Sequence, residues 1–151
     1  MAETYSVDAP AIALSAATAL YMLGIATPST MDADIIEITG GCDSTSAGSL
    51  KVELVTWTSD GTGTAYTMKK MNAASQGRAA VTTAKVDYTV APTGTITVFK
   101  TWILPLPTGP FVLQEPLEYG WIHAPVSTFW GLRYTSTIGS VNGYAGLVIA
   151  E

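Results

Sequence analysis

Apolar and polar residues alternate along much of this chain, and this alternation constrains the fold more than any other feature. Leu50, Val52 and Leu54 alternate with Lys51 and Glu53. Successive side chains of a β-strand point to opposite faces of the sheet, so this spacing predicts a strand with one buried face. The same spacing, or a high content of aromatic and β-branched residues, predicts strands in residues 34–39, 50–58, 95–104, 128–136 and 144–150.

Glycines mark two predicted turns. Asn142-Gly143 tolerates the positive φ angles of a type I′ turn and therefore predicts a hairpin at the C-terminal end. The sequence SDGTG at residues 59–63 predicts a turn that leads into a strand over residues 65–71. Within the first predicted strand, we expect Ile36 and Ile38 to share one face.

Helix signals are weak throughout. Residues 13–23 carry the best one, but the same stretch is also compatible with two short strands, 12–15 and 19–23. The chain has 14 glycines and 8 prolines, and many of them separate the predicted strands. Short strands with such turns predict an all-β fold, which we expect to be a single antiparallel β-sandwich of the jelly-roll kind. We expect an extended N-terminal arm over residues 1–10 and the sandwich domain over residues 11–151.

Charge is scarce in this chain. Only 13% of its residues are charged and 48% are hydrophobic, whereas soluble domains carry about 25% charged residues. Because a monomer needs charge to stay soluble, we expect other copies or a larger partner to cover much of the surface. We expect no membrane as partner. Residues 9–26 are the longest apolar stretch, but they contain many small and polar residues, unlike a membrane-spanning helix. A signal peptide begins with positive charge, whereas no cation precedes Lys51. A net charge of −5 argues against nucleic acid, which requires clustered cations.

Residues suited to catalysis or metal binding are few. His123 is the only histidine and Cys42 the only cysteine, so a thiolate zinc site is excluded and a nucleophile has one candidate base. Asp32, Asp34 and Glu37 lack the spacing of an EF-hand loop. Nothing in the sequence selects a carboxylate pair for glycoside hydrolysis. We therefore expect a non-enzymatic protein with no catalytic residues, no metal and no cofactor.

Aromatic residues are the main candidates for contact with a partner. Three of the four tryptophans lie in predicted strands, where aromatic side chains most often fill the core. Exposed and coplanar tryptophans would instead form a platform for stacking sugars. Trp121 lies in a loop-like segment, and interface cores are enriched in aromatic residues. The candidate partner-contact residues are Tyr5, Phe111, Trp121 and His123.

Several short apolar segments follow one another in a characteristic order. An N-terminal segment with the sequence PAIALSAATA runs into YMLGIATPS and is followed by a predicted strand and by LKVEL. The later segments are FKTWILP, GPFVL and EPL, and all of these segments together span residues 10–117. Their order resembles that in a group of small virion proteins from tailed phages of actinobacteria.

The resemblance implies a capsid decoration (cement) or minor capsid protein, β-rich and commonly trimeric, at local three-fold positions of an HK97-type shell. We therefore expect a homotrimer that binds the major capsid protein on the outer surface of the head. Such a subunit buries one face against sister subunits and another against the shell, which accounts for the scarcity of charge. A carbohydrate-binding β-sandwich module and a tail or baseplate subunit are the alternatives.

Overall fold

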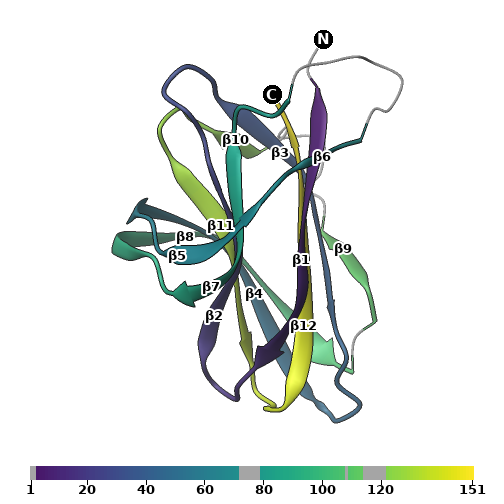
Figure 1. The fold of residues 1–151 in the computed structure, drawn as a ribbon. Helices are drawn as coiled ribbons and strands as arrows, with labels where there is room; N and C mark the ends of the chain where they lie inside the picture. Colours follow the sequence, from purple (N-terminus) through teal and green to yellow (C-terminus); the bar gives the residue numbers. More distant parts are fainter. Residues whose placement is uncertain (1–2, 72–78, 108, 114–121) are drawn as a thin grey trace.

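Two antiparallel β-sheets packed as a sandwich make up this protein (Figure 1). The computed structural model describes residues 3–71, 79–107, 109–113 and 122–151, and these residues include no helix that could cross a membrane. Sheet A contains β1 (Thr4–Leu14), β3 (Ala33–Cys42), β6 (Lys69–Lys70), β9 (Phe111–Leu113), β10 (Ile122–Ala124) and β12 (Val141–Ala150). Sheet B contains β2 (Ala19–Ala26), β4 (Gly48–Ser59), β5 (Thr62–Tyr66), β7 (Thr83–Val90), β8 (Thr93–Leu106) and β11 (Phe129–Ser136). The prediction of an all-β antiparallel sandwich is confirmed.

The strand order differs from the chain order in both sheets. Sheet A has the order β10-β3-β12-β1-β6, with β9 also paired to β3, and sheet B has the order β5-β7-β2-β11-β4-β8. Strands β1 to β4 alternate between the sheets, so each connection crosses the sandwich. The first and last strands pair with each other, and Thr4 lies opposite Ala150. The first and last described residues therefore lie side by side, at one end of β1 and β12 (Figure 1).

The core lies between the sheets and follows the predicted alternation in β4. Leu50, Val52 and Leu54 are fully buried. Leu132 of β11 and Leu147 of β12 belong to the same cluster, which draws on both sheets. Full burial of each such side chain stabilises the fold by about 1.5–3 kcal/mol. The sandwich is therefore held together mainly by apolar burial between its layers.

No N-terminal arm over residues 1–10 is established. Strand β1 begins at Thr4 and pairs with β12, while residues 1 and 2 lie outside the described residues. Tyr5 and Val7 are buried in the core, with 1% and 0% of their surface exposed. The boundary expected between residues 10 and 11 falls inside this strand. Burial of alternate apolar side chains draws the segment into sheet A.

The predicted C-terminal hairpin at Asn142-Gly143 is wrong. Both residues lie inside β12, and the chain turns earlier, where Ser140 has a φ of 58°. Strands β11 and β12 belong to different sheets, so no hairpin joins them. The glycine serves close packing instead, because a Cβ there would lie 3.0 Å from Leu14 and 3.1 Å from Met22.

Ile36 and Ile38 do not share a face as predicted. The ladder between β3 and β12 shifts register between Ile35 and Glu37, which leaves Ile36 without a partner. Ile35 and Ile38 are both buried, whereas Ile36 is half-buried. An extra residue in one strand reverses the alternation beyond it, so this bulge is the reason for the difference.

In two further segments, the structure contradicts one prediction and decides between two others. The strand expected over residues 65–71 is divided between β5 in sheet B and β6 in sheet A, so the chain changes sheet there. Strand β5 follows β4 in the chain but pairs with β7. The description of residues 13–23 as two strands is confirmed, since β1 ends at Leu14 and β2 begins at Ala19. Ala17, with a φ of 56°, lies in the turn between them.

Candidate functional site

Strand β8 forms one edge of sheet B. It is 14 residues long, and one of its sides pairs with β4 from Thr93 to Leu106. No other described strand pairs with its second side. The unpaired backbone groups of a long edge strand are available to another chain. Lys100 is the only charged residue in β8, so little charge opposes such pairing.

Apolar side chains are exposed along this edge strand. The exposed fraction is 71% for Ile103, 56% for Phe99 and 43% for Val98. Residues directly opposite each other in an antiparallel pair point to the same face. Val98 lies opposite Val55 and Ile103 opposite Lys51, which alternate with the core residues of β4. Val98 and Ile103 therefore point outward, away from sheet A.

A β-bulge makes the edge apolar on its other face as well. The ladder between β8 and β4 shifts register at Phe99, which has no partner between Val98 and Lys100. The Phe99 ring meets the buried ring of Trp130, with the ring centroids 5.2 Å apart and the planes at 63°. Phe99 thus lies on the core side of the sheet, and both faces of the edge carry apolar side chains.

A buried ion pair supports the outer face beside β8. Glu53 of β4 is 5% exposed and lies opposite Arg133 of β11. The Arg133 Nε donates to Glu53 Oε2 over 2.8 Å, and Lys51 Nζ lies 3.2 Å from Oε1. Burial alone would raise the pKa of the Glu53 carboxyl, but the hydrogen bonds and charges of Arg133 and Lys51 outweigh it and lower that pKa. Glu53 therefore stays ionised and joins the two strands.

An aromatic cluster makes the neighbouring part of this face rigid. The Trp57 indole lies over two glycines, where a Cβ on Gly24 or Gly131 would come within 2.8 or 2.5 Å of the ring. Asp60 Oδ1 accepts hydrogen bonds from Trp57 Nε1 over 3.2 Å and from the Tyr88 hydroxyl over 3.1 Å. Burial, with the Asp60 carboxylate adding to it, raises the pKa of the Tyr88 phenol well above its usual range. The phenol therefore stays protonated and keeps donating.

The four contact residues expected from the sequence lie in different places. Tyr5 is 1% exposed, and its hydroxyl donates to Glu3 Oε2 over 2.6 Å, which argues against a contact with a partner. Phe111 is half-buried in β9, and His123 lies in β10. Both of these strands pair with β3. Phe111 and His123 thus border the same edge of sheet A, far in strand order from Tyr5. Trp121 lies outside the described residues.

His123 lies between two carboxylates at this edge of sheet A. Its Nδ1 is 3.0 Å from Asp34 Oδ1, and its Nε2 is 3.4 Å from Asp32 Oδ2. The His123 side chain is 55% exposed, so these contacts contribute less than about 1 kcal/mol to stability. Among the described residues, no group of three or more histidine, cysteine or acidic side chains is placed to hold a metal ion. A contact between His123 and a partner stays a prediction.

The described tryptophans do not form an exposed row. Trp57 is 3% exposed and Trp130 is 6% exposed, so both are buried. Trp102 is half-buried in β8. Sugars stack on open aromatic faces, and these three residues do not offer such a platform.

The exposed residues Phe99 and Ile103 of β8 were not identified as contact residues from the sequence. One signal was available. Trp102, Ile103 and Leu104 are three adjacent apolar residues, and in a strand at least one of three neighbours points away from the core. The edge position of the strand carries no sequence signal, because it depends on which strands pair.

No family model, curated protein or solved structure matches this chain. What the protein does must therefore be inferred from its own residues. The strongest feature is the apolar edge strand, which offers surface for a macromolecular contact.

Proposed function

We propose that this protein is a non-enzymatic structural subunit of a phage virion, a capsid decoration protein on the outer surface of the head. It binds the major capsid protein and forms a homotrimer in which β8 contacts a sister subunit. The observation that carries the proposal is the long edge strand with exposed Val98, Phe99 and Ile103. The resemblance of the sequence segments to small virion proteins supports a place in the virion.

The scarcity of charge supports a covered surface. Interface cores are depleted of charged residues and enriched in aromatic ones, and β8 has that composition with one charge in 14 residues. Scattered exposed apolar residues need no explanation, but an apolar group along one strand is typical of an interaction site. Contact through β8 would cover this group and pair its free backbone edge.

We also propose that the sandwich is a jelly roll. The supporting observation is that four strands of sheet A follow the order β1-β12-β3-β10 and four of sheet B the order β2-β11-β4-β8. Strands β5, β6 and β7 then form an insertion between β4 and β8. Double-sheet jelly rolls occur in viral capsid proteins and in lectins, so this topology suits both the virion and the carbohydrate hypotheses. Burial of Trp57 and Trp130 favours the virion hypothesis.

Native mass spectrometry of two matched variants tests the role of β8. Ile103→Lys places an ammonium group in the proposed contact, where burying it without a partner is strongly unfavourable. Val112→Lys is the control, because Val112 is 58% exposed on β9 in the other sheet. We expect trimers for the wild type and for V112K, and monomers for I103K. A hexameric ring would instead favour a tail subunit. The same oligomeric state for I103K and V112K would contradict the role of β8.

Binding to the shell needs a separate measurement. Capsids prepared without this protein are mixed with the wild-type chain and sedimented. We expect the chain to sediment with the capsids and to raise the temperature at which they break open. A chain that is monomeric and stays in the supernatant would rule out the decoration role.

A further inference from the structure

The dipeptide Asn142-Gly143 joins a side-chain amide to a following glycine, a combination that deamidates in flexible chains. The backbone nitrogen of the glycine attacks Cγ of the asparagine, and the new N–Cγ bond closes a five-membered imide. The Cγ–Nδ2 bond breaks and releases ammonia, which carries away the proton of the attacking nitrogen. Water then opens the imide to aspartate or isoaspartate. Glycine favours the attack because it has no Cβ to hinder the approach.

The fold holds this dipeptide in a conformation that opposes ring closure. Strand β12 is a central strand of sheet A, and Gly143 lies between Ile12 of β1 and Cys42 of β3. Closing the imide requires a ψ angle far from the value of about +135° that an antiparallel strand adopts. The core side chains of Leu14 and Met22 lie against Gly143, so its backbone cannot rotate without displacing them.

Asp43 fastens the end of β12 at which this dipeptide lies. Asn142 is the second residue of the strand, and strand ends fray most easily. The Asn142 backbone N–H donates to Asp43 Oδ1 over 2.6 Å, and its side-chain Nδ2 donates to Oδ2 over 2.8 Å. The Asp43 backbone N–H donates in return to the Asn142 carbonyl oxygen over 3.1 Å. The hydrogen bonds from Asn142 lower the pKa of the Asp43 carboxyl, which therefore stays ionised and keeps accepting at neutral pH.

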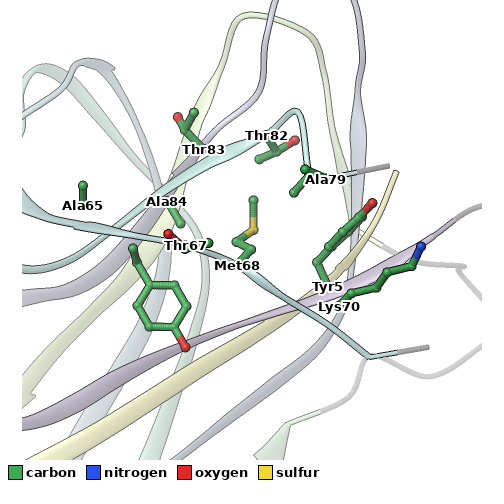
Figure 2. Close-up of a pocket in the computed structure, with 11 residues that line it drawn as sticks. Tyr5, Ala65, Thr67, Met68, Lys70, Ala79, Thr82, Thr83 and Ala84 are labelled. Carbon is green, nitrogen blue, oxygen red and sulfur yellow. The ribbon is translucent and has the colours of Figure 1, made fainter. Parts of the chain in front are cut away.

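A second carboxylate fastens the opposite end of β12. Glu151 follows the strand, and its carboxylate accepts from the backbone N–H groups of Val81 and Thr82 over 2.6 and 3.0 Å. Figure 2 shows Thr82 and Tyr5 among the residues that line a cavity at this end of the sandwich. Both ends of β12 are thus held by an acidic side chain, but Asp43 is the one that contacts the reactive amide.

We propose that Asn142 is a latent deamidation site, which the sandwich and the Asp43 carboxylate keep unreactive and which reacts when this end of β12 opens. The reaction places a carboxylate where the amide now donates to Asp43 Oδ2. Two carboxylates would then face each other at hydrogen-bond distance, and like charges repel. Deamidation therefore hinders the return to the native strand and leaves a covalent record of the opening. This site does not depend on the virion role.

Deamidation rates measured by mass spectrometry test the proposal. The full chain is kept at neutral pH in buffer or in enough urea to unfold it, and samples are digested with trypsin. The tryptic peptide 134–151 contains Asn142 as its only side-chain amide, so its mass reports this site. Native proteins are unfolded for a fraction of about 10⁻³ or less, so we expect a rate about 100-fold or more lower in buffer than in urea. Similar rates in the two solutions would overturn the proposal.

Two matched variants separate the role of Asp43 from protection by the fold as a whole. Asp43→Ala removes two hydrogen bonds to Asn142 and should raise the rate in buffer about 5- to 10-fold, because each bond has a modest net strength. Glu151→Ala removes a carboxylate that also accepts two backbone N–H groups, but at the other end of β12, and should not accelerate the reaction. Urea denaturation gives the global stability of each variant. An acceleration in Asp43→Ala no larger than its loss of global stability predicts would contradict the local role of Asp43.

Asn142→Asp reproduces the charge of the product. We expect this variant to melt at a lower temperature than the wild type at neutral pH, because the new carboxylate lies against Asp43. The same substitution in the Asp43→Ala background should lower the melting temperature less. Equal effects in the two backgrounds would contradict the repulsion.

Discussion

Replacing Glu53 by alanine tests how much the buried ion pair contributes to the fold. The change leaves the Arg133 guanidinium without its carboxylate, and removal of one partner from a buried pair costs about 3–5 kcal/mol. The Arg133 side chain keeps 19% of its surface exposed, so water solvates it in part. We therefore expect a loss of about 2–3 kcal/mol, which lowers the melting temperature by about 4–12 °C for a domain of this size.

Urea denaturation at neutral pH measures this loss, with two further variants for comparison. Lys51 contacts the same carboxylate, but its side chain is 42% exposed, so Lys51→Ala should cost less than about 1 kcal/mol. The double variant Glu53→Leu with Arg133→Met removes both charges and should recover most of the stability. A loss below about 1 kcal/mol in Glu53→Ala would refute the reasoning, because such a value is typical of an exposed pair.

The pH dependence of stability gives an independent check. The folded state lowers the pKa of Glu53 below its ordinary value of 4.5. Its contribution is therefore present above that value and is lost as the pH falls through the lower pKa of the folded state. The difference in unfolding free energy between the wild type and Glu53→Gln should shrink across this acidic window. A constant difference would mean that the charge of Glu53 does not contribute.

Two further predictions concern packing. Gly131→Ala should destabilise the protein by about 1–3 kcal/mol in urea denaturation, because the added Cβ would crowd the Trp57 ring and the Leu23 carbonyl oxygen. Gly109→Ala is the control, because nothing lies within 4 Å of the Cβ added there. Equal losses of stability in the two variants would contradict this explanation. Cys42 is buried, with only 7% of its surface exposed, so its thiol should react with a thiol-specific dye only after the protein unfolds. Fast reaction of the thiol in the native protein would disprove its burial.

Part of the fold was predictable because strand periodicity is local. Leu50, Val52 and Leu54 alternate with polar residues in the sequence and all three are buried. Asn142-Gly143 shows the limit of local patterns, since a dipeptide typical of a hairpin turn lies inside β12. A Cβ on its glycine would crowd the side chains of Leu14 and Met22, which come from distant parts of the chain.

The candidate contact surface was less predictable than the fold. Tyr5 lies in the segment predicted as an arm, whereas pairing with β12 buries it. The segment around Phe99 and Ile103 was predicted as a strand, but the alternation does not show that Phe99 and Ile103 are exposed. They are exposed because β8 has a neighbour on one side only among the described strands.

The strand character of this protein, its low content of charged residues and its scarcity of side chains suited to catalysis follow from the sequence alone. These properties depend on residue type and on spacing along the backbone, which are local. The pairing of the strands, the bulges at Ile36 and Phe99 and the apolar edge of β8 become visible only in the folded chain. These outcomes depend on contacts between residues far apart in the chain, and a local pattern does not specify such contacts.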